Sequence, residues 1–197
     1  MLSFIENIGL ILQRYGAVFA QGLWNTLWLS FVSVFLGTFL GILVALGKLS
    51  RHKLLNGVVS TYIEIIRGTP ILLQLYFFWL ALPNILPSIS DTTCILSALV
   101  VNASAYIAEV IRAGIQAVDA GQREASLSLG MTERAIMTKV IFPQAIKNIL
   151  PALGNEVIVM IKQTSLASVF FFGELMTAYK QVQSTTFLAL EPLTISG

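Results

Sequence analysis

The chain has few charged residues, few metal-binding side chains and no recognisable catalytic motif. Only 11% of its 197 residues are charged, whereas soluble domains carry about 25%. Its one cysteine, Cys94, excludes an internal disulfide and a cysteine-rich metal site. Its one histidine, His52, lies in a basic stretch, where we interpret it as a solvated loop residue. We therefore expect no metal site and no enzymatic activity in this chain.

A phosphate-binding loop is also missing. The stretch GILVALGKLS has five residues between Gly41 and Gly47 where that motif needs four, and Leu49 stands where Ser or Thr is required. We expect no cofactor in this chain. If it drives uphill transport, the energy comes from an ion gradient or from a partner.

The N-terminus does not have the pattern of a signal peptide. Glu6 stands where a basic region is expected, and Arg14 interrupts the apolar run. Apolar residues instead recur at helical spacing: Phe4, Ile5, Ile8, Ile11, Leu12 and Tyr15. This pattern predicts a short amphipathic segment over residues 1–22 that lies at the membrane surface.

Apolar residues make up 56% of the chain and come in long blocks, which predicts an all-α, polytopic membrane protein. Four stretches are long and apolar enough to span a membrane: residues 23–47, 54–82, 92–118 and 150–172. Small residues fall every four positions in the first of them: Ser33, Gly37, Gly41 and Ala45. Such a face lets a second helix pack closely.

The basic residues orient the predicted spans. They gather in the first and third connections: Lys48, Arg51, Lys53, Arg123, Arg134, Lys139 and Lys147. Residues 83–91 contain none. We therefore expect a multi-pass membrane protein, with both basic connections in the cytoplasm and the N-terminus outside. Four spans leave the C-terminus outside, and we expect the sequence to stop where another helix should begin.

Charged residues remain inside the predicted spans, where each costs about 2.5–3.5 kcal/mol at a helix centre. Glu64 and Arg67 are three residues apart, and so are Glu109 and Arg112. Each pair can meet on one helix face. The pairs either neutralise each other or serve a transport pathway, since ionisable groups within membranes are commonly functional.

Polar residues within three of the spans can line a path. The third span carries a continuous polar stripe: Asn102, Tyr106, Glu109, Arg112 and Gln116. The second contributes Thr69, Pro70 and Gln74, and Pro70 frees a backbone carbonyl that needs a local partner. The fourth adds Asn155, Glu156, Lys162, Gln163, Thr164 and Ser165. Both signs of charge are present, as a zwitterion such as an amino acid requires.

The connection over residues 119–150 is charged and helix-forming. Gly130 suits a helix end that needs positive φ, and Thr132 can cap a second helix with Glu133 in its first turn. Pro143 is expected to end or kink that helix. The pattern predicts two short helices with an elbow at Gly130. They either dock in a partner's groove or form a solvated loop.

This connection resembles the cytoplasmic signature loop of ABC importer permeases, which is Glu-Ala-Ala, three residues, Gly, nine residues, Ile, one residue, Leu-Pro. The matching residues are Glu124, Ala125, Ser126, Gly130, Val140, Ile141, Phe142 and Pro143. Ser126, Val140 and Phe142 depart mildly from the motif. The stretches YIEIIRGTPILLQLYFFWLALP, NASAYIAEVIRAGIQAV and IKQTSLASV are similar to the polar amino acid permeases, which import histidine, arginine, glutamine and similar solutes.

The resemblance implies a permease subunit with the type I ABC importer fold over residues 20–197, of which five spans are expected and about four are present. It implies a second permease subunit, identical or related, and two cytoplasmic ATP-binding subunits that hold ATP and Mg²⁺. It also implies an extracytoplasmic solute-binding protein and a polar amino acid substrate. Nucleic acid is not an expected partner.

The resemblance also suggests the residues that act. For contact with the ATPase we expect Glu124, Ala125, Gly130 and Pro143. For the substrate pathway we expect Glu64, Arg67, Thr69, Asn102, Tyr106, Glu109 and Glu156. The alternative function is a gradient-driven secondary amino acid transporter, although such proteins commonly show repeated halves. A membrane-embedded enzyme is less favoured, because a catalytic cluster is missing.

Overall fold

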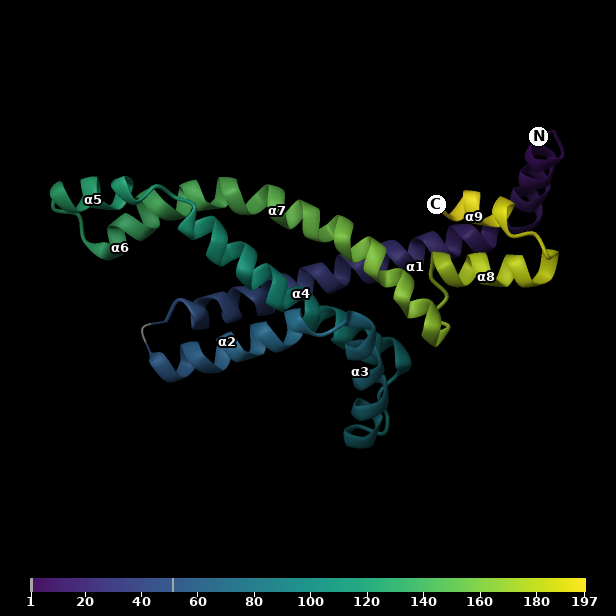
Figure 1. Ribbon diagram of the computed structural model, residues 1–197, viewed down its shortest axis with the longest axis horizontal. Coiled ribbons are helices and arrows are strands. Elements are labelled where there is room, and N and C mark those ends of the chain that lie inside the picture. The colour runs from purple at the N-terminus through teal and green to yellow at the C-terminus, as the bar shows by residue number, and fades with distance from the viewer. Residues whose placement is uncertain (1, 51) are drawn as a thin grey trace.

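A computed structural model describes residues 2–50 and 52–197, and every regular element in them is helical (Figure 1). This confirms the all-α prediction. Met1 and Arg51 lie outside the described residues. In chain order the elements are α1 (Leu2–Lys48), α2 (Lys53–Gly68), α3 (Ile71–Ile85), α4 (Asp91–Gln116), α5 (Ala120–Ser128), α6 (Glu133–Ile136), a π-helical turn (Met137–Ile141), α7 (Phe142–Gln163), a 3₁₀ helix (Thr164–Phe170), α8 (Leu175–Thr186) and α9 (Leu190–Ser196).

Helix α1 includes both the predicted amphipathic segment and the first predicted span. It is 47 residues long, with no break in the described residues where residues 1–22 were expected to end. Near its N-terminal end, Ile11 and Phe19 are buried against Ala178 and Val182 of α8. Figure 1 shows this purple end of α1 beside the yellow α8 and α9. The N-terminal segment therefore packs on the end of the chain while remaining continuous with the span.

The small-residue face of α1 packs against α4. Ser33, Gly37, Gly41 and Ala45 are all buried, as the spacing predicted. A Cβ atom added at Gly37 would lie 2.6 Å from the Cβ of Ala103 on α4. Real Cβ atoms do not approach so closely, so glycine is required there for the two helices to touch. Since α4 also contacts α2, α3 and α7, it is the central helix of the bundle.

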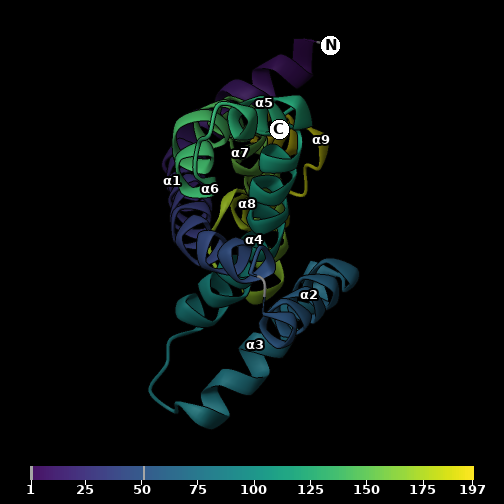
Figure 2. The ribbon, with the colours of Figure 1, turned by 90° about the vertical axis from the view of Figure 1, so that its left-hand side faces the viewer.

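The second predicted span is broken, which corrects the expectation of one helix over residues 54–82. Helix α2 ends at Gly68, α3 begins at Ile71, and the two are bent by 108°. Pro70 lies in the break, where it has no N–H to continue the helix and its ring excludes the preceding helical geometry. Figure 2 shows α2 and α3 leaning away from the column formed by α1, α4 and α7.

The third and fourth predicted spans correspond to α4 and α7. Helix α4 agrees with the predicted 92–118 to within two residues. The fourth span was expected to begin at residue 150, but α7 begins at Phe142 and passes at Thr164 into the 3₁₀ helix. Within residues 2–50 and 52–197, two helices are long and apolar enough to cross a membrane, or up to 4 if each bent pair is counted as one span.

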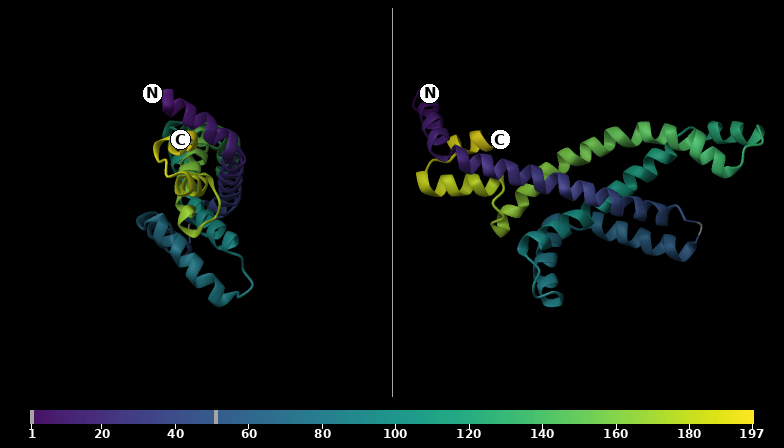
Figure 3. Two further views of the ribbon diagram at one scale, coloured as in Figure 1. Left: turned by 90° about the vertical axis from the view of Figure 1, so that its right-hand side faces the viewer. Right: turned by 180° about the vertical axis from the view of Figure 1, so that it is seen from behind.

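The two basic connections lie at the same end of the molecule. In the right-hand view of Figure 3, the turn between α1 and α2 is at the same end as α5 and α6, while both chain termini are at the opposite end. The two basic connections thus share one end of the molecule, as the charge distribution predicted. Which end faces the cytoplasm stays a prediction of the charge rule.

Candidate functional site

The first candidate site is the helical elbow between α4 and α7. Helix α5 is capped by the side chain of Asp119, which accepts a hydrogen bond from the Gly121 N–H at 2.8 Å. At its other end Gly130 has φ 75°, and the Met131 N–H reaches back to the Ser126 carbonyl at 3.1 Å. These are features of a Schellman motif, in which glycine takes the left-handed position. The predicted helix end with positive φ at Gly130 is confirmed.

The second half of the elbow begins as predicted, because Thr132 caps α6 by accepting a hydrogen bond from the Ala135 N–H at 3.4 Å. Across the elbow, Arg123 of α5 donates to Glu133 of α6 at 2.7 Å. This hydrogen bond and the charge of Glu133 raise the pKa of Arg123. Both side chains are about half exposed, at 52% and 53%. The pair therefore adds little to the stability of the elbow and mainly links α5 to α6.

Pro143 neither ends nor kinks a short helix, which corrects that expectation. It lies in the first turn of α7, a helix that continues to Gln163. The π-helical turn Met137–Ile141 comes directly before it and joins α6 to α7. A π-helical turn accommodates an extra residue in the helix, which relieves the clash a proline makes with the preceding turn. The second arm of the elbow is therefore one end of a membrane helix.

The predicted contact residues are accessible at this end of the molecule. Glu124, Ala125, Gly130 and Pro143 are all exposed, whereas Ser126 is buried. Two apolar side chains beside them were not predicted: Leu127 is 46% and Leu129 is 82% exposed. Their signal in the sequence was weak, because leucines in a membrane protein are expected to face lipid or core. Together these residues form an accessible apolar and acidic surface on α5 and the elbow.

The second candidate site is the break between α2 and α3. Pro70 has no N–H for the Ile66 carbonyl four residues earlier, and the side chain of Gln74 replaces it. The Gln74 Nε2 donates to the Ile66 carbonyl oxygen at 2.7 Å. The same amide also reaches the carbonyl and the hydroxyl of Thr69, at 3.2 and 2.8 Å. The predicted local partner for the freed carbonyl is therefore found.

Gln74 also joins the break to α4. Its Oε1 accepts a hydrogen bond from the Asn102 Nδ2 at 3.0 Å, and the side chains of both residues are buried. Gln74 was noted among the polar residues of the second span but was not among the predicted pathway residues. Its bond to Asn102 depends on how two helices cross, which a single sequence does not reveal.

Charged residues gather next to this break. The carboxylate of Glu109 accepts from Arg112 at 2.7 Å and lies 3.8 Å from Arg67 of α2. The Arg67 guanidinium also lies over the ring of Tyr106, 5.3 Å from its centroid. The predicted pair Glu109–Arg112 is confirmed. The predicted pair Glu64–Arg67 is wrong: no ion pair joins them in the described chain, Glu64 is exposed, and Arg67 contacts α4 instead.

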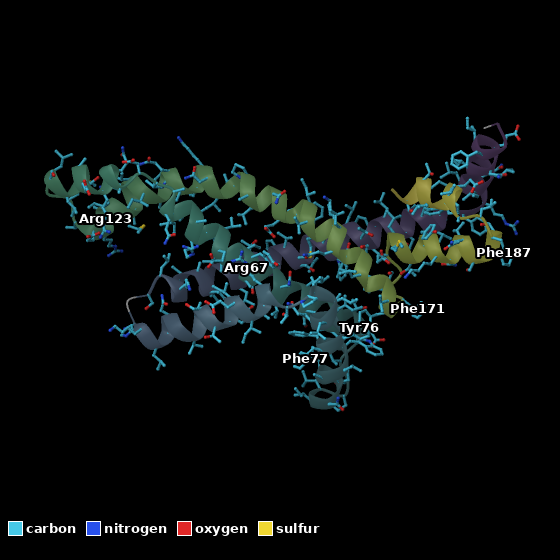
Figure 4. The ribbon with its side chains drawn as sticks, viewed as in Figure 1. Arg67, Tyr76, Phe77, Arg123, Phe171 and Phe187 are labelled. Carbon is cyan, nitrogen blue, oxygen red and sulfur yellow. The ribbon has the colours of Figure 1, made fainter. Side chains whose placement is uncertain are left out.

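Glu156 completes this group from α7. Its side chain is half-buried and lies within electrostatic range of Arg67, although the described chain forms no ion pair between the two. Figure 4 shows Arg67 near the middle of the molecule, far from Arg123 at the elbow. We call Arg67, Tyr106, Glu109 and Glu156 the polar cluster. Of the other predicted pathway residues, Thr69 and Asn102 lie at the adjacent break, where both bond to Gln74. Glu64 is exposed, and in the described chain it forms no ion pair with the cluster.

The arrangement offers the charges that binding of a small zwitterion requires. The polar cluster carries both signs of charge on three helices, and its Arg67 lies near the middle of the molecule. In residues 2–50 and 52–197, no group of three or more His, Cys, Asp and Glu is placed to hold a metal ion. A charged cluster enclosed by apolar helices is typical of a membrane transport subunit.

Comparison with known proteins assigns the family. Residues 37–195 match the family model of the binding-protein-dependent transport system inner membrane component. The chain is 38% identical over 178 residues to the arginine transport system permease protein ArtQ of Bacillus subtilis, covering 90% of this chain and 81% of ArtQ. It is also 38% identical over 179 residues to a putative glutamine transport system permease protein GlnP of Rickettsia bellii, covering 90% and 82%.

Solved structures share the fold of this chain. The crystal structure of an amino acid ABC transporter with histidines superposes with a TM-score of 0.90 at 49% identity, covering 95% of this chain and 87% of that chain. An inward facing conformation of the MetNI methionine ABC transporter shares the fold, with a TM-score of 0.74 at 23% identity, covering 90% of this chain and 86% of that chain.

The chain therefore belongs to the family of binding-protein-dependent inner membrane transport components, as a multi-pass permease with the ABC importer fold. The resemblance to the polar amino acid permeases is confirmed. The alternative of a gradient-driven secondary transporter is excluded by this membership, as is an enzyme. Such a permease works with an ATPase and a binding protein, and ATP is bound by the ATPase partner rather than by the permease.

Proposed function

We propose that this chain carries a polar amino acid across the bacterial inner membrane and that the polar cluster is its recognition site. The observation that carries this proposal is that Arg67 of α2 lies 3.8 Å from Glu109 and over the ring of Tyr106, both on α4, beside a helix break. Broken helices commonly form substrate sites near the middle of the membrane. Relatives named for arginine and glutamine transport support the substrate class.

In this proposal Arg67 binds the substrate's carboxylate and Glu156 its α-amino group. Glu109 is shared by two arginines and is better suited to hold Arg67 in place than to bind substrate. The full proposed pathway is Glu64, Arg67, Thr69, Asn102, Tyr106, Glu109 and Glu156. Asn102 supports the wall of this pathway, since its side-chain amide is bonded to Gln74.

The proposed assembly has two permease subunits, identical or related, two cytoplasmic ATP-binding subunits and an extracytoplasmic solute-binding protein. The elbow, with Glu124, Ala125, Gly130 and Pro143, contacts the ATPase. Its exposed position and the basic residues around it support a cytoplasmic location, which leaves the N-terminus outside. Residues 119–150 then serve as the coupling loop, residues 20–197 as the transport domain, and residues 1–22 as an N-terminal segment.

Substrate binding to the permease itself tests the proposal. The permease–ATPase complex in lipid nanodiscs is titrated with tritiated L-arginine, and with tritiated L-glutamine in parallel, without the binding protein. We expect saturable binding of at least one amino acid, weakened about tenfold or more by Glu156→Gln, because a charge-assisted hydrogen bond is lost. Glu6→Gln, at an exposed carboxylate near the N-terminus, is the matched control. Equal affinity of Glu156→Gln and the wild type would refute the role of Glu156.

A further inference from the structure

Gln74 makes more contacts than the helix break requires. The break needs one donor for the carbonyl that Pro70 leaves free, and Gln74 Nε2 supplies it to Ile66 at 2.7 Å. The second interaction, in which Asn102 donates to Gln74 Oε1, satisfies nothing in the backbone. It buries two side-chain amides in the bundle, and buried amides are costly unless they are paired. The bond therefore serves to attach the break to α4.

This attachment lies next to the contacts of Arg67. Ile66 and Thr69, whose carbonyls bind Gln74, flank Arg67 in the sequence. On α4, Asn102 is one turn from Tyr106, which the Arg67 guanidinium covers at 5.3 Å. Residues four apart share one helix face. The bond to Asn102 and the contacts of Arg67 are thus neighbouring links between the same two elements.

The position of the Arg67 guanidinium depends on these links. Its side chain is 43% exposed and lies 3.8 Å from Glu109, which is longer than a hydrogen bond. A long, partly exposed arginine held this loosely takes other rotamers unless its backbone is fixed. Gln74 fixes that backbone from both sides, and Asn102 fixes Gln74 relative to α4.

We propose that Gln74 is a positioning residue for the substrate site: through Asn102 it fixes the end of α2, so that Arg67 points at the bound amino acid's carboxylate. The assignment rests on the proposed function, because it concerns the arginine that binds substrate. Gln74 itself does not touch the substrate. Its effect on affinity is transmitted through Arg67.

Two variants separate positioning from simple closure of the break. Gln74→Leu removes every hydrogen bond of the side chain. Asn102→Leu removes only the attachment to α4 and leaves Gln74 able to bind the Ile66 carbonyl. Each is made alone and together with Arg67→Gln. Thr61→Val is the control, since the Thr61 hydroxyl bonds only within α2, to the Gly57 carbonyl.

The measurement is the dissociation constant of the permease–ATPase complex in nanodiscs for tritiated L-arginine, with tritiated L-glutamine in parallel. We expect Gln74→Leu and Asn102→Leu each to raise it about five- to tenfold, the equivalent of one net hydrogen bond. In the Arg67→Gln background neither should raise it further, because the residue through which they act is absent. Thr61→Val should bind as the wild type does.

Other outcomes overturn the assignment. If either substitution raises the dissociation constant by its full factor in the Arg67→Gln background as well, the substituted residue acts independently of Arg67. If Asn102→Leu binds normally, Gln74 serves the break alone. Where Gln74→Leu fails to assemble, Asn102→Leu decides by the same criteria. A wild-type complex that binds neither amino acid refutes the proposed function itself, and this assignment with it.

Discussion

At the scale of single residues, the sharing of Glu109 between two arginines is the main electrostatic feature of the bundle. Arg112 lies 2.7 Å from its carboxylate and Arg67 lies 3.8 Å away. Glu109 is only 17% exposed, so its charge is screened less by water than that of a surface pair. One carboxylate thus partly neutralises two guanidinium groups that would otherwise be costly inside a membrane.

Removal of this carboxylate should destabilise the bundle. Glu109→Gln leaves two partly buried guanidinium groups without their counter-charge, and we expect a loss of about 1–2 kcal/mol in stability. The thermal unfolding midpoint of the detergent-solubilised complex measures this loss. The double variant Glu109→Gln/Arg112→Gln should recover part of it, because one of the unpaired charges is gone. A single variant as stable as the wild type would contradict this account.

The same residues show how far a sequence can predict ion pairs. Glu64–Arg67 and Glu109–Arg112 have identical spacing, yet only the second pair forms. The difference arises because Arg67 meets Tyr106 and Glu109 across the α2–α4 contact. Spacing along one helix identifies which side chains can meet. It does not identify what a neighbouring helix offers them instead.

At the scale of elements, the contact between α1 and α4 depends on the absence of a side chain at Gly37. We expect Gly37→Leu to separate the helices, at a cost of about 1–3 kcal/mol or more. Its Cβ alone would lie 2.6 Å from the Cβ of Ala103. Gly16→Leu is the matched control in the same helix, because a Cβ there meets nothing within 4 Å. Monodisperse yield after size-exclusion chromatography compares the two variants, and equal yields would count against the close contact.

The elbow depends on the backbone of Gly130. Its φ of 75° is accessible to Gly and Asn but strained in β-branched residues. We expect Gly130→Val to lose capture of the ATPase subunit when the two are co-expressed and purified from membranes. Gly130→Asn should keep most of it. If both variants capture the ATPase equally well, the shape of the elbow is not what the partner recognises.

Two of the prolines, Pro70 and Pro143, show what pattern reasoning leaves open. Both Pro70 and Pro143 were expected to disturb a helix. Pro70 marks a bend of 108°, with Gln74 replacing the lost hydrogen-bond donor. Pro143 lies in a continuous helix, because the π-helical turn before it makes room for its ring. Whether a proline bends a helix or is accommodated within it depends on neighbouring packing and on a change of helical register. A single sequence displays neither.

At the scale of the whole molecule, the elbow and the polar cluster are joined by two helices. Helix α4 carries Glu109 and ends at Gln116, three residues before the Asp119 that caps α5. Helix α7 carries Glu156 and continues directly from the elbow through the π-helical turn. A movement imposed on the elbow therefore acts on both helices that contribute carboxylates to the cluster. We expect ATP-driven movements of the partner to change the cluster in this way.

Uptake by the reconstituted system tests this account most directly. The permease and its ATPase are placed in proteoliposomes, the solute-binding protein is supplied on the side of the chain termini, and ATP on the side of the elbow. The account predicts uptake of tritiated L-arginine or L-glutamine that requires both ATP and the binding protein and persists when ionophores abolish ion gradients. Uptake that proceeds without ATP and stops with the ionophores would contradict it.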